Sequence, residues 1–257
     1  MVDCVKAHRD NPFFVYLPHS MPHIPLYVPD DVRDPDPKNA YTNTIEHIDA
    51  EVGRLLDVLD ELKLAENTYV IYTTDNGPWL TFKHHGGSAG PLRDGKGTTF
   101  EGGQRVPCLI RGPGIPAGTV CGELTGTIDV LPTIAAITEQ PLPEGKRIDG
   151  MDVSGLWSGT KGTSPRSEFV HYTSRGDLEG IRQNNWKLLV KRPRAPRNRK
   201  RAPAAPRQRQ VLLFDLSQDV GEQNNLAEEQ PGIVNRLRAR MQELDAEITA
   251  NARAPWV

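Results

Sequence analysis

The sequence is poor in cysteine and has no long apolar run. Each absence excludes a class of protein. Its three cysteines, Cys4, Cys108 and Cys121, are scattered, so they form neither a metal-ligand spacing nor a dense disulfide framework. A single disulfide between Cys108 and Cys121 remains an alternative at this point. No apolar stretch approaches the length of a membrane span, and no secretory signal opens the sequence. We therefore expect no membrane partner.

The composition is typical of a soluble protein with long loops. Apolar residues make up 37% of the 257 positions, mean hydropathy is −0.52, and there are 23 glycines and 22 prolines. The 31 basic residues nearly balance the 33 acidic ones, so the chain as a whole is not strongly charged. A chain of this length can bury a sizeable core, as one large domain or as a domain with a smaller subdomain.

The first 160 residues follow an α/β pattern. Runs of β-branched, aromatic and aliphatic residues predict short strands at 13–17, 68–74 and 106–110. Between the first two, an amphipathic helix is predicted to begin at Asn43, with Glu46 completing a capping box, and to pack one apolar face onto the sheet. A second helix is predicted at 128–138, with Pro132 near its first turn. Helices that alternate with buried strands predict a mostly parallel sheet flanked by helices.

From about Ser164 the pattern changes to alternating polar and apolar residues. This alternation predicts a small antiparallel sheet with strands at 168–173, within 178–190, and at 210–216. Residues 230–250 carry apolar side chains at helical spacing, which predicts one packed helix. We therefore expect two units, an α/β domain over 1–160 and a small α+β subdomain over 161–257.

A basic segment interrupts the predicted antiparallel sheet at 191–210. It is rich in arginine and lysine and holds no acidic residue, and its prolines and alanines disfavour a packed core. A solvated basic loop is the first interpretation, and contact with an anionic polymer is the second. Nucleic acid is disfavoured as a partner because the segment has no aromatic residue to stack on bases.

The chemistry centres on the stretch that follows the predicted strand at 68–74. Asp75 and Asn76 come where that strand ends, with Gly77 behind them. Side-chain oxygens at the ends of strands are placed where open α/β sheets build their sites, and a carboxylate with an amide suits Ca²⁺ or Mg²⁺. Seven glycines lie between Gly86 and Gly103, and Lys96 stands among them. Glycines let a backbone approach an anion and lysine adds a point charge, so the stretch predicts a metal and oxyanion site.

A second candidate element is the proline-rich loop PHSMPHIP at 18–25. Its prolines hold the loop extended, and it follows the predicted strand at 13–17. Its two histidines, His19 and His23, have the chemistry of proton donors or of metal ligands. Two hydrogen-bonding loop histidines without a catalytic role are the alternative at this point.

Four segments together resemble the type I sulfatases. They are PHSMPHIP (18–25), TTDNGP (73–78), GPLRDGKGTTFEGGQRVP (90–107) and LFDLSQDVGEQNNL (213–226). The likeness runs from Pro12 to about Ala250, and the third segment is its most specific part. It implies an alkaline-phosphatase-like fold and a sulfuric ester hydrolase of the arylsulfatase type. In this family the histidine motif comes about midway, so the chain corresponds to the C-terminal half, and Met1–Ala7 has the pattern of a helix end.

The resemblance also implies roles for single residues. Asp75 and Asn76 would be metal ligands, with Ca²⁺ the expected ion and Mg²⁺ the alternative. His23 and Lys96 would be catalytic and substrate-binding, contacting the sulfate and its leaving oxygen, with one of them assisting departure. The substrate would be a sulfate ester, either an aryl sulfate or a sulfated carbohydrate. The family implies a periplasmic or extracellular location, or a lysosomal one in a eukaryote.

One part of the expected chemistry is missing from the sequence. Sulfatases of this type use a formylglycine nucleophile made from the first residue of C/S-x-P-x-R, and no cysteine or serine here heads that pattern. We therefore expect the chain alone to be an incomplete, inactive fragment. Two alternatives stay open, a phosphatase or phosphodiesterase of the same superfold and a non-catalytic protein that binds sulfated polymers through 191–210.

Overall fold

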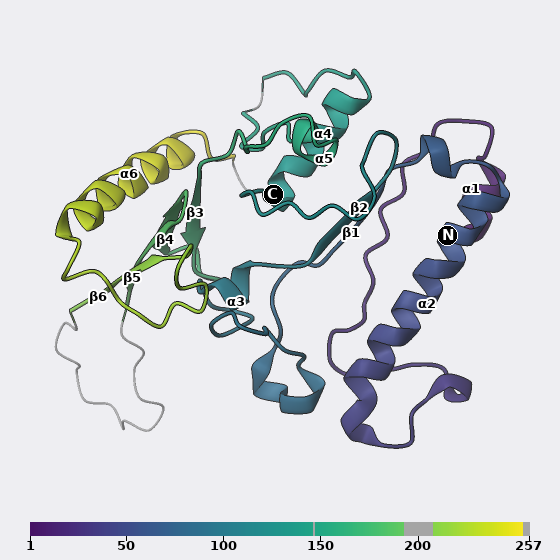
Figure 1. Ribbon diagram of the computed structural model, residues 1–257, viewed down its shortest axis with the longest axis horizontal. Helices are drawn as coiled ribbons and strands as arrows, with labels where there is room; N and C mark the ends of the chain where they lie inside the picture. Colours follow the sequence, from purple (N-terminus) through teal and green to yellow (C-terminus); the bar gives the residue numbers. More distant parts are fainter. Residues whose placement is uncertain (146, 193–207, 254–257) are drawn as a thin grey trace.

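The protein is an α/β molecule with two separate β-sheets, seen in a computed structural model that describes residues 1–145, 147–192 and 208–253 (Figure 1). The helices are α1 (Val2–Ala7), α2 (Ala40–Glu61), α3 (Glu101–Gln104), α4 (Val130–Ile137), α5 (Ser154–Trp157) and α6 (Pro231–Ala250). The strands are β1 (Val70–Thr73), β2 (Cys108–Arg111), β3 (Glu168–Tyr172), β4 (Leu178–Gln183), β5 (Trp186–Lys191) and β6 (Gln210–Asp215). Short 3₁₀ turns include η2 (Pro37–Asn39) and η4 (Leu80–His85).

Helix α2 packs as its apolar spacing predicts, but its start differs. Val58 and Leu59 are buried in a cluster with Val5 of α1, and Val70 of β1 packs against that cluster. The helix begins at Ala40 and not at Asn43, so the predicted capping box is wrong. The Asn43 side chain instead accepts a hydrogen bond from the Asp34 backbone N–H and donates one to the Val32 carbonyl oxygen. The Asn43 side chain therefore bonds to the preceding loop and does not cap the helix.

Strands β1 and β2 form a two-stranded antiparallel pair, with Val70 opposite Arg111 and Thr73 opposite Cys108. The predicted strands at 68–74 and 106–110 are therefore confirmed, but the mostly parallel sheet is not formed among the described residues. A run of β-branched residues indicates a strand without encoding the direction of its neighbour, which explains this error. The antiparallel pairing places the end of β1 beside the start of β2.

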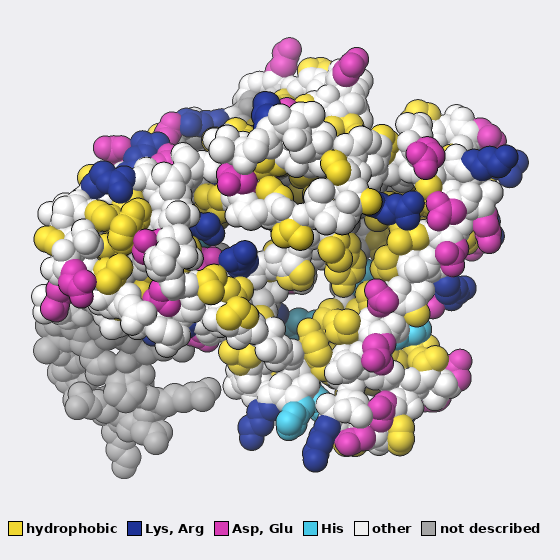
Figure 2. Space-filling view, viewed as in Figure 1, with side chains coloured by type: hydrophobic (Ala, Val, Ile, Leu, Met, Phe, Trp, Pro, Cys, Tyr) yellow, Lys and Arg dark blue, Asp and Glu magenta, His cyan; other side chains and the backbone are white. Residues whose placement is uncertain are grey.

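The predicted strand at 13–17 is wrong. The segment has no strand assignment, and Phe14 and Tyr16 are 76% and 78% exposed. Its aromatic and aliphatic residues have β-propensity, but a strand also needs a neighbour to complete its hydrogen bonds. Figure 2 shows further hydrophobic side chains around the hollow in the middle of the molecule, beside α2.

The C-terminal sheet has the order β3-β4-β5-β6, and every neighbouring pair is antiparallel, as the alternating pattern predicts. Helix α6 covers one face (Figure 1), where Ile181, Leu188 and Leu213 pack against Leu237 and Met241. The predicted helix at 230–250 is thus confirmed, with its start one residue later. The opposite face carries Leu189, Leu212 and Phe214, which pack against Phe100 of the glycine-rich stretch.

Helix α4 confirms the prediction for 128–138, with Pro132 in its first turn. It is tied to the C-terminal sheet by a buried ion pair between Asp129 and Arg166, whose Nε donates to Asp129 Oδ2 at 2.9 Å. Asp129 also accepts backbone hydrogen bonds from Gly126 and Met151. A buried pair whose remaining lone pairs are satisfied in this way fixes the path of the chain between the two sheets.

Four other sequence expectations concern the cysteines, a membrane span, the basic segment and the division into two units. All three cysteines are free and exposed, so no Cys108–Cys121 bridge is present. In the part of the chain that the structure describes, no helix is long and apolar enough to cross a membrane. Most of the basic segment 191–210 lies outside the described residues. The division into 1–160 and 161–257 stays a prediction.

His171 on β3 gives the fold a pH dependence. Its side chain is 6% exposed, and neither ring nitrogen has a hydrogen-bond partner among the described residues. Burial, reinforced by the positive charges of Lys187, Arg182 and Lys191, lowers the pKa of His171 from 6.5 to about 3. The folded protein therefore binds a proton only near pH 3, whereas the unfolded chain binds it near pH 6.5. Stability is fully present above pH 6.5 and declines as the pH falls toward 3.

We expect His171→Leu to flatten the acid side of the stability profile. In the native sequence this histidine removes up to about 1.4 kcal/mol of unfolding free energy for each pH unit below its unfolded pKa. Urea unfolding at a series of pH values, followed by tryptophan fluorescence, measures the difference. His84→Leu, at an exposed histidine, serves as the control and keeps the native profile. Identical slopes for His171→Leu and the native chain would contradict this account.

Candidate functional site

The site is built on the loop between β1 and β2. Asp75 and Asn76 follow the end of β1, and α3 lies just before β2. The two ends of the loop therefore meet at the same end of the strand pair. The Gly77 N–H donates to the Gly103 carbonyl oxygen at 3.2 Å. A Cβ on Gly77 would lie 1.8 Å from the Gly102 carbonyl oxygen, so only glycine permits this close approach.

Lys96 is held beside the residues that follow Asn76. Its backbone N–H donates to the Pro78 carbonyl oxygen at 2.9 Å, and a Cβ on Gly95 would lie 2.3 Å from that same oxygen. The Lys96 ammonium lies 5.0 Å from the centre of the Trp79 ring, within cation–π range. The lysine therefore has a fixed backbone and an aromatic surface against its charge.

His23 reaches the same tryptophan from the proline-rich loop. The His23 and Trp79 ring centroids are 5.6 Å apart with a tilt of 50°. His23 Nδ1 lies 2.8 Å from the Ile24 carbonyl oxygen, which accepts only if Nδ1 carries the hydrogen. This contact leaves Nε2 as the nitrogen that exchanges a proton, and Nε2 has no hydrogen-bond partner among the described residues.

Two of the sequence-predicted residues, His23 and Lys96, lie beside Trp79. His23 and Lys96, separated by 73 positions, both contact its ring, and Asp75 and Asn76 precede it by a few residues. Trp79 itself was missed by sequence reasoning, although its position directly after the Asp-Asn-Gly-Pro run is a usable signal. His19 lies apart from this group and lines a hollow of about 390 Å³ with Tyr27 and His47.

Asp75 and Asn76 match a hard cation by donor type but supply only part of a coordination shell. Their side chains offer carboxylate and amide oxygens, and Thr74 Oγ1 donates weakly to Asp75 Oδ1 at 3.4 Å. Calcium takes about six to eight oxygen ligands, more than these two residues provide. In residues 1–145, 147–192 and 208–253, no group of three or more His, Cys, Asp or Glu could hold a metal ion.

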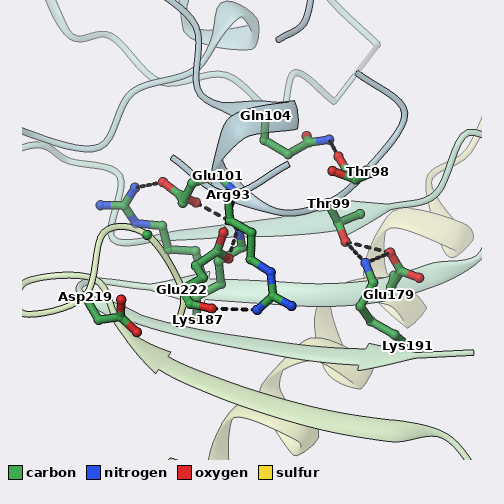
Figure 3. A network of polar contacts seen from close by, with 12 residues as sticks. Arg93, Thr98, Thr99, Glu101, Gln104, Glu179, Lys187, Lys191, Asp219 and Glu222 are labelled. Atoms are coloured by element: carbon green, nitrogen blue, oxygen red, sulfur yellow. Dashed lines mark hydrogen bonds and ion pairs between the residues drawn. The ribbon is translucent and has the colours of Figure 1, made fainter. Parts of the chain in front are cut away.

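A buried ion network fixes the glycine-rich stretch to the C-terminal sheet (Figure 3). Lys187 on β5 is 0% exposed and lies 2.8 Å from Glu101 Oε1 and 3.0 Å from Glu222 Oε1. Glu222 Oε2 accepts from the Glu101 backbone N–H at 2.7 Å, and the Glu222 carbonyl oxygen accepts from Arg93 Nη1 at 2.6 Å. Burial raises the pKa of Glu222, against the lowering influence of Lys187. The network therefore fixes the segment that carries Lys96 at both of its ends, at Arg93 and at Glu101.

A second set of contacts joins the same stretch to β4 and β5. Thr99 Oγ1 donates to Glu179 Oε2 at 2.6 Å, and Lys191 Nζ lies 2.8 Å from both of these oxygens (Figure 3). Lys191 Nζ also lies 4.4 Å from the centre of the Phe100 ring, and the Arg93 guanidinium lies 4.1 Å from the same centre. Together with the contacts of Glu222 to Arg93 and Glu101, these interactions join the sequence motifs 90–107 and 213–226 in one packed unit.

The comparisons with known proteins identify the family of the chain. The sulfatase family model matches residues 1–140, which is more than half of the chain. The chain belongs to the sulfatase family. Human arylsulfatase A is 35% identical over 257 residues, an alignment that covers 94% of this chain and 50% of the human protein.

Solved structures place the chain in the sulfatase fold. A structure described under the metabolism of multiple glycosaminoglycans by Bacteroides thetaiotaomicron has a TM-score of 0.82 at 27% identity, covering 95% of this chain and 52% of that one. Ps i-CgsB in complex with k-i-k-neocarrahexaose has a TM-score of 0.77 at 26% identity, covering 99% and 54%. The predicted alkaline-phosphatase-like fold class is thus confirmed at the level of the family. The chain spans about half the length of the sulfatases it matches.

Proposed function

We propose that the protein of which these 257 residues are a part is a sulfuric ester hydrolase. The observation that carries the proposal is the shared contact of His23 and Lys96 with the Trp79 ring, in a chain of the sulfatase family. Asp75 and Asn76 precede Trp79 by a few residues in the sequence. The group combines a fixed cation, a proton-exchanging imidazole and two hard oxygen donors. Together with a nucleophile, these are the parts that cleavage of a sulfate ester requires.

Lys96 binds the sulfate oxygens in this scheme. Negative charge on those oxygens persists through the reaction, and a preorganised ammonium stabilises it without moving at the moment of bond cleavage. Its backbone bond to Pro78, together with the clamp of Arg93 and Glu101 on the buried network, supports this fixed position. A lysine on a free loop would have to be ordered first, at a cost in conformational entropy.

His23 donates the proton to the departing alkoxide or phenoxide oxygen. The hydrogen on Nδ1 is occupied by the Ile24 carbonyl, so the proton given to the leaving group is the one on Nε2. Protonation of the leaving oxygen removes the cost of expelling a free anion. The imidazole then returns to its charged form by taking a proton from solvent.

The cofactors of the family fit this arrangement in part. Sulfatases are generally metal-dependent and use a formylglycine nucleophile. We assign Asp75 and Asn76 as two ligands of a Ca²⁺ ion, with Mg²⁺ as the alternative, and such an ion would withdraw charge from the sulfate. The nucleophile comes from outside the 257 residues, since no C/S-x-P-x-R occurs in them.

The substrate class follows from the same site. We propose a sulfate ester of a phenol or of a carbohydrate, and the relative bound to k-i-k-neocarrahexaose supports the second. The expected location is periplasmic or extracellular, or lysosomal in a eukaryote. The basic segment 191–210, proposed as a contact for sulfated polymer, falls mainly outside the described residues.

A comparison of two ester classes tests the proposal. The protein is expressed from the complete reading frame of its gene, in a host that forms formylglycine. We expect kcat/KM for p-nitrocatechol sulfate to exceed that for p-nitrophenyl phosphate by at least about 100-fold. Preference for the phosphate would assign the chain to a phosphatase of the same superfold. Salt-sensitive binding of heparin without turnover of either ester would leave only the polymer-binding function.

A further inference from the structure

A pocket lies at the end of the β1–β2 pair opposite to the candidate site. Tyr69 precedes β1 and Pro113 follows β2, whereas Asp75 and Pro107 lie at the other end of the pair. The pocket has a volume of about 230 Å³ and is bordered by this strand end, by α4 and by α5. Because an apolar cavity of about 150 Å³ can hold benzene, the pocket has room for one six-membered ring with a small polar group.

The apolar walls of the pocket include two aromatic residues. The walls are formed by Tyr69, Ile115, Ile137 and Trp157. The Tyr69 ring lies across Gly112, where a Cβ would come within 2.5 Å of the ring atom Cδ1. The Tyr69 hydroxyl donates to the Pro113 carbonyl oxygen at 2.9 Å, so the ring is held at both ends. An aromatic wall that is already held in place loses little conformational entropy on binding, which favours a ligand with a flat ring.

Two hydroxyl groups beside the pocket already donate within the protein. Ser158 Oγ donates to the Ser154 carbonyl oxygen at 3.1 Å and lies 2.9 Å from Thr160 Oγ1. Since a hydroxyl carries one hydrogen, Ser158 accepts from Thr160, and neither group has a hydrogen left for a ligand. The pocket is therefore poorly suited to a sugar, whose many hydroxyl groups need several partners.

Lys161 supplies a positive charge to the pocket that it helps to line. Its backbone N–H donates to the Gly155 carbonyl oxygen at 2.9 Å, and a Cβ on Gly155 would lie 2.7 Å from Lys161 Cδ. The alkyl part of the side chain therefore lies against α5. The residue is exposed, and its ammonium group has no ion-pair partner in the part of the chain that the structure describes. An anion can bind there without displacing a carboxylate of those residues.

We propose that this pocket binds a small molecule that consists of one flat ring with a single anionic group, such as an aromatic carboxylate. The ring packs against Tyr69 and Trp157, and the anionic group pairs with Lys161. The pocket and the candidate site lie at opposite ends of the strand pair, so binding in the pocket is independent of sulfate-ester hydrolysis.

Benzoate, acetate and benzyl alcohol test the two parts of the ligand, because acetate lacks the ring and benzyl alcohol lacks the charge. Ligand-observed NMR titration of the protein from the complete reading frame should show benzoate binding at least about fivefold more tightly than either of the others. Lys161→Ala should reduce the affinity for benzoate to about that for benzyl alcohol, and Trp157→Ala to about that for acetate. Lys38→Ala, at an exposed lysine elsewhere, should leave it unchanged.

A further variant, Lys96→Ala, separates the pocket from the candidate site. Benzoate binding that is lost in Lys96→Ala and kept in Lys161→Ala would place the ligand at the candidate site and overturn the pocket. Equal affinities for the three ligands, or no binding of benzoate by the folded protein, would also overturn it. If Trp157→Ala does not fold, the exposed Lys161 decides. Benzoate binding that depends on Lys161, in a protein that hydrolyses no sulfate ester, would contradict the proposed function and leave the pocket standing.

Discussion

Lys96→Ala should lower kcat/KM for p-nitrocatechol sulfate by about 10²- to 10³-fold in the protein from the complete reading frame, as removal of one preorganised oxyanion donor does in other enzymes. The ammonium lies 5.0 Å from the centre of the Trp79 ring, and the backbone of Lys96 is fixed through Pro78. Removing it takes charge away from the place where sulfate oxygens need it. Steady-state kinetics of the purified variant measure the effect.

Two further variants make the Lys96 result interpretable. Lys38→Ala removes a charge from an exposed lysine on η2 and should leave kcat/KM within about twofold of the native value. Lys96→Arg keeps the charge but changes its shape and donor geometry, so it should recover only part of the activity. Native activity in Lys96→Ala would contradict the assignment of Lys96 to the sulfate.

Lys187→Met should destabilise the 257-residue chain by about 3–5 kcal/mol, the typical effect of removing one partner from a buried ion pair. Lys187 is fully buried and is the cation that Glu101 and Glu222 share. Methionine fills a similar volume but leaves two buried carboxylates close together. Among the described residues, the ion-pair partner that remains is Arg182, at 3.5 Å from Glu101. Urea unfolding followed by tryptophan fluorescence measures the change.

The Lys187 prediction has a compensating variant and a surface control. The double variant Lys187→Met with Glu222→Gln neutralises both members of one pair, so it should recover part of the lost stability. Arg54→Met breaks an exposed pair with Glu51 and should cost at most about 1 kcal/mol. Equal stability of Lys187→Met and Arg54→Met would show that the network does not hold the two parts of the molecule together.

Much of the fold could be predicted from the sequence because it depends on local periodicity. The alternation within β3 to β6 and the apolar stripe of α6 each require only one buried face, and both predictions are confirmed. The strand at 13–17 and the parallel sheet fail for a different reason. Whether an extended segment becomes a strand, and in which direction its neighbour runs, depends on residues far away in the sequence.

The residues of the candidate site also fall into two groups, those that the local sequence indicates and those that only the structure reveals. Asp75, Asn76, His23 and Lys96 stay predictions from residue type and motif, and the structure adds that His23 and Lys96 both contact the Trp79 ring. The buried role of Lys187 could not be predicted, since a lysine inside a strand is expected to lie at the surface and its partners are 86 and 35 positions away. Trp79 was missed because the sequence does not show that this loop residue lies beside both His23 and Lys96.

The most direct test of the central claim is the position of a bound sulfate ion in a crystal structure of the protein from the complete reading frame. We expect Lys96 Nζ and His23 Nε2 both to lie at about 2.7–3.2 Å from sulfate oxygens, with the Trp79 ring beside them. Asp75 and Asn76 should then coordinate a cation next to the same sulfate. A sulfate bound by only one of Lys96 and His23, or with Asp75 turned away from it, would contradict the account.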